Sequence, residues 1–351
     1  PFIIRTSLIV KPAVSRLRSL RGDPSVRGFE TVENTEPPQR TEPLTESQSC
    51  DDAWLNILIS SDRNFLPHML TSVVSTLETN QDIINEVFLL STELGQRDLH
   101  DINNFLDSRF GKRLNLIGID ESLVSSFYVS GHLTRETYLR FFAAEILEES
   151  IDYILYVDCD TIVMGSLSPL KQWLKALSSE FESPPFLAAA CPESTGNHLK
   201  RYGFSAKNYF NAGVMLLNLA QMREEGIGEK LSRTAQALHG QLPWWDQDVL
   251  NLELEGRWVE LDPAYNYTGK HDVPNPVIAH FAGGKKPWEF GCTHPLRHEY
   301  ARYRALTPYA QYSRDGLMRF LYEKLLPKWW RKRRKLLKRA KKKISLTLRR
   351  G

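Results

Sequence analysis

Short, wholly apolar runs alternate with segments of helical periodicity from Leu55 onward, and this alternation restricts the fold more than any other feature. Such runs predict strands at 55–59, 87–90, 114–119 and 153–157, and the segments between them predict helices at 67–79, 93–110 and 134–148. Strand and helix recur about every 25–30 residues, which is typical of βαβ units. The sequence therefore predicts an α/β fold with an open, mostly parallel central sheet flanked by helices.

Weaker patterns extend this architecture beyond Gly165. Further strands are expected at 186–190, 214–217 and 277–281, and one long helix at 219–239. The opening residues are instead rich in Arg, Ser, Pro, Glu and Thr without periodic apolar positions, a composition typical of disorder. We therefore predict three parts, which are a disordered leader or linker over 1–52, a globular domain over 53–317 and a basic tail over 318–351.

The net charge of +3 conceals an uneven distribution of charge along the chain. Fifteen of the 45 Lys and Arg, but one of the 42 Asp and Glu, lie in 319–351, so this segment carries +14 and the rest −11. Trp329 and Trp330 stand among these cations, and apolar residues recur at helical spacing as far as Ile344. The combination favours an in-plane amphipathic helix on an anionic membrane surface. Nucleic acid is the competing partner, but paired tryptophans and an acidic body argue against it.

Cysteine spacing and hydropathy bear on the compartment. The four cysteines, Cys50, Cys159, Cys191 and Cys292, are widely spaced and form no C-x-x-C pair, which favours a reducing compartment. No run approaches about 18 uncharged apolar residues, so no membrane-spanning helix is expected. The chain begins at Pro1 rather than Met, which leaves open whether residues precede it. We expect a cytoplasmic protein, peripheral on the inner face of the cytoplasmic membrane.

Asp158-Cys159-Asp160 directly follows the expected strand 153–157 and is the main candidate site. Open α/β sheets bind their ligands at the carboxyl ends of strands. Two carboxylates one residue apart can face the same ion, and their oxygen atoms suit Mg²⁺ or Mn²⁺. A solvated acidic turn is the alternative, because D-x-D pairs are common. The apolar strand before the pair favours the metal site.

A second segment, His280 to Trp288, also follows a short apolar run. His280 offers a nitrogen ligand, Gly283 and Gly284 allow backbone N–H groups to approach a phosphate, and a lysine can neutralise diphosphate charge. Taken alone, a Gly-Lys-Pro loop is most often a turn. Together with the acidic pair, the segment predicts a cation that bridges the two phosphates of a nucleotide sugar.

Six short motifs follow one another along the chain. They are Ile59-Ser60-Ser61-Asp62-x-Asn64-Phe65, Tyr138-Leu139-Arg140, Leu155-Tyr156-Val157-Asp158-Cys159-Asp160, Tyr209-Phe210-Asn211-Ala212-Gly213-Val214, Asp246-Gln247-Asp248-x-Leu250-Asn251 and His280 to Trp288. In these motifs and their order the chain resembles glycosyltransferase family 8 from Leu55 to about Tyr303. The family includes bacterial lipopolysaccharide galactosyl- and glucosyltransferases and glycogenin. Six motifs in one order are far more specific than any one of them.

The resemblance implies a GT-A fold, which is a Rossmann-like nucleotide-sugar-binding architecture, and retaining transfer of galactose or glucose from a UDP-sugar. It makes Asp158, Asp160 and His280 the ligands of Mn²⁺ or Mg²⁺. Carried over position by position, it implies donor contacts at Ser60, Ser61, Asp62, Asn64, Phe65, Asp158, Asn211, Ala212, Gly283 and Lys286. The expected acceptor is a hydroxyl of a glycan or glycolipid, with a lipopolysaccharide core as the first candidate.

The resemblance also assigns catalytic roles to Arg140, Asp246 and Gln247. In the family the arginine lies across the donor, and the apolar neighbours of Arg140 argue against the alternative of a surface charge. Asp246 and Gln247 are expected beside the anomeric carbon. Because an amide oxygen carries no full charge, Gln247 is a poor nucleophile. We therefore expect front-face transfer, in which UDP departs and the acceptor hydroxyl attacks from the same side.

Several positions also have a purely structural interpretation. Phe65 is expected to stack on uracil but could be a core aromatic at a helix start, and Asn211 with Ala212 could form a simple turn. Glu193 stands where relatives often have an aspartate that contacts donor or acceptor, so its role is undecided. Two other functions stay as alternatives. One is an inactive relative that binds UDP-sugars or glycans, and the other is a sugar-1-phosphate nucleotidyltransferase, which would need a Gly-rich basic loop that we do not find.

Overall fold

The computed structural model describes residues 53–129, 135–180, 185–194, 196–205, 208–270 and 272–310, all within one compact unit, Asp51–Gly351. The expected leader and basic tail lie outside these residues, so both stay predictions, as do the domain boundaries. None of the described helices is long and apolar enough to cross a membrane.

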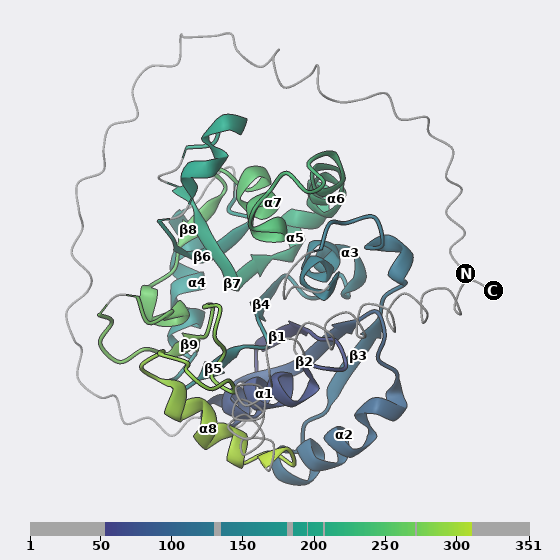
Figure 1. Ribbon diagram of the computed structural model, residues 1–351, viewed down its shortest axis with the longest axis vertical. Helices are drawn as coiled ribbons and strands as arrows, with labels where there is room; N and C mark the ends of the chain where they lie inside the picture. Colours follow the sequence, from purple (N-terminus) through teal and green to yellow (C-terminus); the bar gives the residue numbers. More distant parts are fainter. Residues whose placement is uncertain are drawn as a thin grey trace, which may run out of the picture. The chain divides into compact units, whose positions relative to one another are not determined.

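A central sheet of seven strands runs through the described chain (Figure 1). Its order is β3-β2-β1-β4-β7-β6-β8. The strands are β1 (Leu55–Ser60), β2 (Ile84–Ser91), β3 (Leu114–Gly118), β4 (Tyr153–Val157), β6 (Ala188–Pro192), β7 (Phe210–Asn218) and β8 (Trp258–Glu260). β7 is antiparallel to both β4 and β6, and the other neighbouring pairs are parallel. The mostly parallel sheet expected from the alternating pattern is therefore confirmed.

Each face of the sheet is covered by its own helices, because successive strand side chains point to opposite sides. In β1, Ile57 and Ile59 pack into one apolar cluster, whereas Leu58 packs into the other. The first cluster takes in α1 (Leu66–Asn80), α2 (Gln96–Phe110) and α4 (Pro169–Glu180). The second takes in α3 (Ala143–Ile146), α5 (Leu219–Glu224), α6 (Ile227–Ala237) and α7 (Trp245–Glu253). Each fully buried Leu or Ile contributes about 1.5–3 kcal/mol, so both faces stabilise the sheet.

A small second sheet brings distant parts of the chain beside the end of β4. β5 (Thr161–Val163) and β9 (Ile278–His280) pair antiparallel, with Thr161 opposite His280. Their residues share a third apolar cluster with α8 (Arg297–Ala305). The described 3₁₀ helices are η2 (Glu121–Leu123), η3 (Arg135–Phe142), η4 (Gly196–Tyr202) and η6 (Pro263–Asn266).

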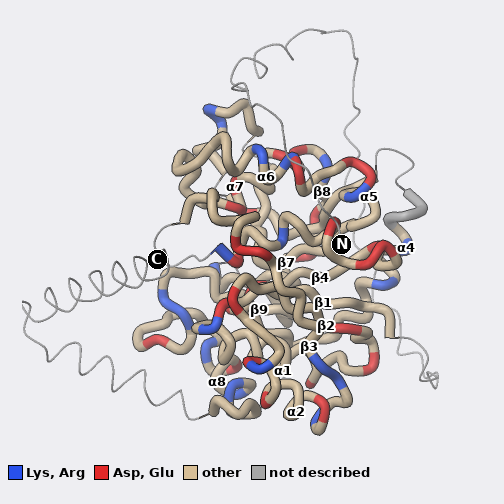
Figure 2. The backbone as a smooth tube through the Cα atoms, turned by 90° about the vertical axis from the view of Figure 1, so that its right-hand side faces the viewer, with Lys and Arg blue, Asp and Glu red and all other residues tan. Residues whose placement is uncertain are grey.

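Charged residues avoid the central strands. β1, β4, β6 and β7 contain no Lys, Arg, Asp or Glu. In Figure 2, β1, β4 and β7 are tan, while many acids and bases lie on the surrounding helices and loops. The acids of the candidate site follow the end of β4, so they lie at the edge of this uncharged layer.

Several expected elements differ from the structure in their bounds, and β7, for example, is nine residues long where 214–217 was expected. The helix expected at 134–148 is the 3₁₀ helix η3 followed by the four-residue α3. Residues 138–141 of η3 are all buried, so the segment runs through the protein and has no exposed face of the kind an amphipathic helix needs. The helix expected at 219–239 is two helices, because Gly226 adopts the left-handed conformation with φ of 59° between them. The strand expected at 186–190 is β6, which runs two residues later.

Candidate active site

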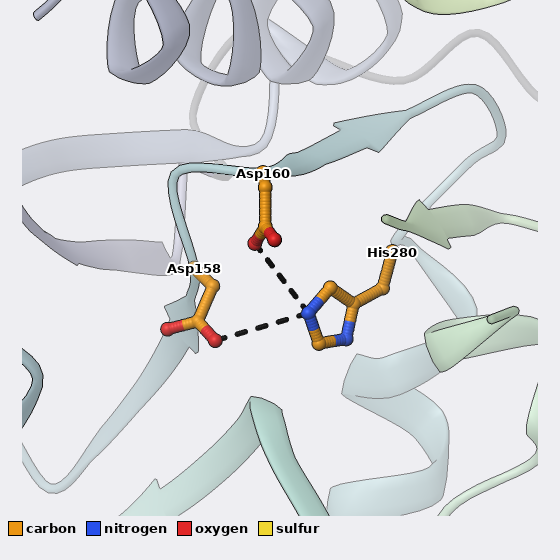
Figure 3. A group of neighbouring side chains, drawn as sticks. All are labelled: Asp158, Asp160 and His280. Carbon is orange, nitrogen blue, oxygen red and sulfur yellow. Dashed lines mark ion pairs between the residues drawn. The ribbon is translucent and has the colours of Figure 1, made fainter. Parts of the chain in front are cut away.

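Asp158, Asp160 and His280 come from three neighbouring segments and point toward one another (Figure 3). Asp158 follows β4, Asp160 precedes β5, and His280 ends β9. The Nε2 atom of His280 lies 3.4 Å from Oδ1 of Asp160 and 3.8 Å from Oδ2 of Asp158. One ligand atom from each residue lies within 4.8 Å of the others. The structure therefore brings together the three residues that the sequence proposed as metal ligands.

Gly213 makes room for the His280 ring. A Cβ atom at position 213 would lie 2.1 Å from Cε1 of His280, a distance that side-chain rotation alone does not relieve inside a strand. The same residue accepts a hydrogen bond through its carbonyl from the backbone N–H of Asp158, at 2.8 Å. The glycine of β7 thus positions two of the three candidate ligands.

One carboxylate oxygen of Asp158 is hydrogen bonded by Arg140 and Tyr156, and the other faces His280. Nη2 of Arg140 and the hydroxyl of Tyr156 donate to Oδ1 at 2.9 and 2.7 Å. The single Tyr156 hydrogen is used on this carboxylate, so Ser60, at 3.2 Å, donates in turn to the Tyr156 oxygen. Oδ2, the atom nearer His280, is the one presented to a ligand.

The Lys286 ammonium forms an ion pair with the carboxylate of Asp160. Its Nζ lies 2.5 Å from Oδ2 of Asp160 and 2.8 Å from the carbonyl of Phe281. Burial by itself would raise the pKa of Asp160, but Lys286 and His280 together hold it well below its usual range. The carboxylate therefore stays ionised although it is buried. Two carboxylates and one imidazole are a donor set that fits a divalent cation. The Lys286 ammonium has no lone pair and is not part of that set.

Arg140 also bridges to Asp246 from its position beneath the site. Its side chain is 3% exposed, and Nη2 lies 3.2 Å from Oδ2 of Asp246. Nη1 donates to the carbonyl of Ala212 at 2.5 Å, and the guanidinium stacks over the Tyr156 ring at 4.1 Å. Burial raises the pKa of Asp246 to about 6, against the opposing effect of Arg140. Both residues therefore adjoin Asp158, and Arg140 is engaged by protein groups on several sides.

Gln247 is oriented by a backbone N–H and a buried tyrosine. The N–H of Ala212 donates to Oε1 of Gln247 at 3.0 Å, and Nε2 donates to the Tyr209 hydroxyl at 2.9 Å. Tyr209 donates onward to Asp248, which is fully buried and also lies 2.7 Å from Nε2 of His198. The amide of Gln247 is thereby fixed relative to the Asn211-Ala212 segment.

Asn211 and Glu193 lie together on the opposite side of His280. Nδ2 of Asn211 donates to Oε2 of Glu193 at 2.9 Å, and Lys270 donates to the other oxygen at 2.5 Å. Burial would raise the pKa of Glu193, but these two hydrogen bonds lower it. Glu193, whose role the sequence left undecided, is thus an ionised partner of Asn211.

The expected donor contacts from Ser60 to Phe65 lie at the end of β1 and in the loop before α1. Ser61 and Asp62 are buried, and Asp62 accepts a hydrogen bond from the N–H of Phe65 at 2.9 Å, which begins α1. Burial raises the pKa of Asp62. Asn64 is exposed, and Phe65 is half-buried against the apolar cluster of α1. The structure therefore gives Phe65 both a core contact and a partly open face.

The loop that carries Lys286 is anchored by aromatic residues. The Trp288 ring stacks on His68 with centroids 3.5 Å apart, and Phe65 meets Trp288 edge-on at 6.0 Å. Burial, helped by nearby Arg304, lowers the pKa of His68 to about 3, so this ring is neutral. Gly283 is exposed, and a Cβ there would meet nothing described within 4 Å.

Four groups of this site were not proposed from the sequence. Tyr156 had a usable signal, because a side chain two residues before Asp158 in extended backbone shares its face. His68 sits three residues after Phe65 and so shares its helix face. Asn266 and Lys270 had no signal, since their approach to the site depends on the path of the chain through η6.

Comparison with known proteins places the chain among characterised sequences. A sequence profile of glycosyl transferase family 8 matches residues 56–292. General stress protein A of Bacillus subtilis is 30% identical over 283 residues, which cover 73% of this chain and 95% of that protein. Lipopolysaccharide 1,3-galactosyltransferase of Salmonella typhimurium is 24% identical over 283 residues, which cover 75% and 82%. The crystal structure of galactosyltransferase LgtC, with donor and acceptor sugar analogs, superimposes with a TM-score of 0.62 at 20% identity, over 79% of this chain and 99% of that one. The GT-A fold implied by the sequence motifs is confirmed by this likeness.

Proposed function

The chain belongs to glycosyltransferase family 8, and from this premise we propose that it transfers a hexose, galactose or glucose, from a UDP-sugar to a glycan hydroxyl with retention of configuration. The observation that carries the proposal is the convergence of Asp158, Asp160 and His280 beside Lys286. A nucleotide-sugar transferase must neutralise UDP as it departs, and this cluster could hold the cation that does so.

Asp158, Asp160 and His280 would hold Mn²⁺ or Mg²⁺. When bound, the cation supplies Lewis-acid stabilisation of the negative charge that develops on the β-phosphate as the glycosidic bond lengthens. Lys286 can reach the same diphosphate, because its ammonium lies at the edge of the site and the residues before it, 283–285, are exposed. Donor binding would then release Lys286 from Asp160 to the phosphate oxygens.

The remaining site residues orient the sugar. Arg140 keeps Asp158 and Asp246 apart at fixed positions, since each carboxylate contacts the same guanidinium. Gln247 and Ala212 are hydrogen bonded to each other, and together they would lie beside the anomeric carbon in a fixed arrangement. Such an arrangement would favour attack by an acceptor hydroxyl on the face that UDP leaves. Water is disfavoured there because the acceptor fills that face.

The acceptor that we propose is a glycolipid or glycan, with a lipopolysaccharide core as the first candidate. The similarity to a lipopolysaccharide 1,3-galactosyltransferase supports this choice. An anionic membrane surface, bound through the basic residues of 319–351, would bring the enzyme to such an acceptor. We propose a position on the inner face of the cytoplasmic membrane for the same reason.

Asp160→Ala tests the proposal. Transfer from UDP-galactose and UDP-glucose with Mn²⁺ is expected to fall by about 100- to 1000-fold, the scale of losing one charge-stabilising group. Asp107→Ala is the matched control, because Asp107 forms an exposed ion pair with Arg113 away from the site. Turnover of Asp160→Ala within a few-fold of wild type, still dependent on metal, would refute the assignment. UDP release that does not require an acceptor would point to a hydrolase instead.

A further inference from the structure

A line of hydrogen bonds leads from His280 away from the candidate metal ligands and into the protein. Nδ1 of His280 lies 2.9 Å from Oδ1 of Asn266, and Nδ2 of Asn266 lies 3.0 Å from Oδ1 of Asn211. Asn211 continues to Glu193, as described above. His280, Asn266 and Asn211 are each less than 8% exposed, so water does not substitute for these contacts.

The direction of every bond in this line follows from one backbone group. The N–H of Gly213 can only donate, and it meets Oδ1 of Asn211 at 3.0 Å. Asn211 must therefore turn its Nδ2 to Glu193, which as a carboxylate can only accept. Since Oδ1 of Asn211 is an acceptor, Asn266 must offer it Nδ2. The Oδ1 atom of Asn266 then necessarily faces His280.

A carbonyl oxygen facing Nδ1 requires hydrogen on that nitrogen. In a neutral imidazole with hydrogen on Nδ1, the other nitrogen carries a lone pair. That other nitrogen, Nε2, is the atom directed at Asp158 and Asp160. The opposite tautomer would put an N–H where a ligand lone pair is needed and would set two acceptors against each other at Asn266.

We propose that Asn266 is a positioning residue that holds His280 in the Nδ1–H tautomer, so that Nε2 is ready to bind a divalent cation. The inference rests on the proposed function for the identity of the cation, but not for the tautomer itself. Asparagine suits this position because its amide accepts from His280 and donates to Asn211 at the same time. Glu193, held in turn by Lys270, fixes the far end of the line.

Two substitutions at Asn266 separate positioning from packing. Asn266→Leu keeps a branched side chain of similar size but offers no acceptor, and its affinity for Mn²⁺ alone is expected to fall about 10- to 100-fold. Asn266→Asp keeps an acceptor at Nδ1 and is expected to bind Mn²⁺ within a few-fold of wild type. Asn218→Leu is the matched control at the far end of β7, where a buried amide bonds to Phe186 and Gln221. It is expected to lower stability without changing Mn²⁺ affinity.

The tautomer is read from the ¹⁵N shifts of His280 in the metal-free full chain, at a pH where the imidazole is neutral, with His280→Gln used for assignment. Wild type and Asn266→Asp are expected to show hydrogen on Nδ1, and Asn266→Leu a mixture of tautomers. Hydrogen on Nε2 in the wild type, or unchanged Mn²⁺ affinity in Asn266→Leu, would overturn the proposal. If the wild type binds no Mn²⁺, the proposed function fails, while the wild-type spectrum still decides the tautomer even if a variant does not fold.

Discussion

At the scale of single residues, the burial of Arg140 sets the electrostatics of the site. Removing a guanidinium from water costs several kcal/mol unless its donors are paired. Here the guanidinium is surrounded by two carboxylates, the carbonyls of Thr137 and Ala212, and the face of the Tyr156 ring. A permanent positive charge therefore lies beneath acids that would otherwise repel one another, which keeps the site assembled without a bound cation.

Asp246 predicts a specific dependence of stability on pH. Its pKa in the folded protein is about 6, above the ordinary value, so the folded state binds this proton more tightly than the unfolded state. The contribution of Asp246 to the free energy of unfolding is therefore greatest below about pH 4 and falls, by up to about 3 kcal/mol, as pH rises to about 6.

Urea unfolding of the metal-free wild type and of Asp246→Asn across this range measures the effect. The difference between the two proteins in the free energy of unfolding is expected to change by about 1–3 kcal/mol between pH 4 and 7. The wild type becomes less stable relative to Asp246→Asn as pH rises. Parallel pH profiles would mean that Asp246 titrates normally and is not held in a desolvated position.

The residues of the site differ in how far sequence could predict them. Asp158 and Asp160 were found because an all-apolar strand precedes them, and His280 because a second apolar run ends at it. These signals are local. Asn266 reaches His280 through the turn of η6 and the bridge between Tyr267 and Ala279 of β9, which no local pattern encodes. The tautomer of His280 depends on that contact, so it could not be inferred from sequence.

At the scale of helices and strands, sequence patterns predicted some elements closely and missed others. β4 was predicted with its observed bounds, and α1 to within one residue at each end. α7 was not predicted, since its buried face includes Asp246, Asp248 and Asn251, which hide the apolar periodicity. The same three residues serve the site and its supporting contacts. A functional helix therefore looked like a loop in the sequence.

The loop between β9 and α8 predicts a second measurable effect. Trp288 stacks on His68 of α1 and so ties the Lys286 loop to the body of the protein. Trp288→Ala is expected to raise the KM for the UDP-sugar about 10-fold and to lower kcat less. The reason is that the loop loses its anchor while the ligands Asp158, Asp160 and His280 stay in place.

Steady-state kinetics with varied UDP-sugar test this expectation. Phe290→Ala is the matched control, because it removes an aromatic residue that is 48% exposed from the same loop. Equal kinetics for Trp288→Ala and wild type would show that the loop is held by other contacts. A fall in kcat at unchanged KM would instead place Trp288 in the chemical step.

At the scale of the whole molecule, charge separates the catalytic part from the end of the chain. Residues 1–318 carry −11 and residues 319–351 carry +14, so the two parts favour different surroundings. An acidic body is repelled by an anionic surface, and a basic segment is attracted to it. Such a pairing would orient the molecule as well as attach it.

We predict that five consecutive cations, Arg331 to Lys335, provide much of this attachment. Changing all five to Gln is expected to weaken partition of the full chain onto vesicles with anionic lipid by about 4000-fold, at about 1 kcal/mol per basic residue near the surface. Added salt should weaken partition of the wild type in the same direction, because it screens exposed charge.

Changing Trp329 and Trp330 to Ala should instead weaken partition by an amount that does not depend on salt. Vesicle flotation with anionic and with neutral lipid measures each effect. Equal flotation on both lipids, or tight RNA binding by a wild-type chain that does not float, would contradict the membrane role of this segment.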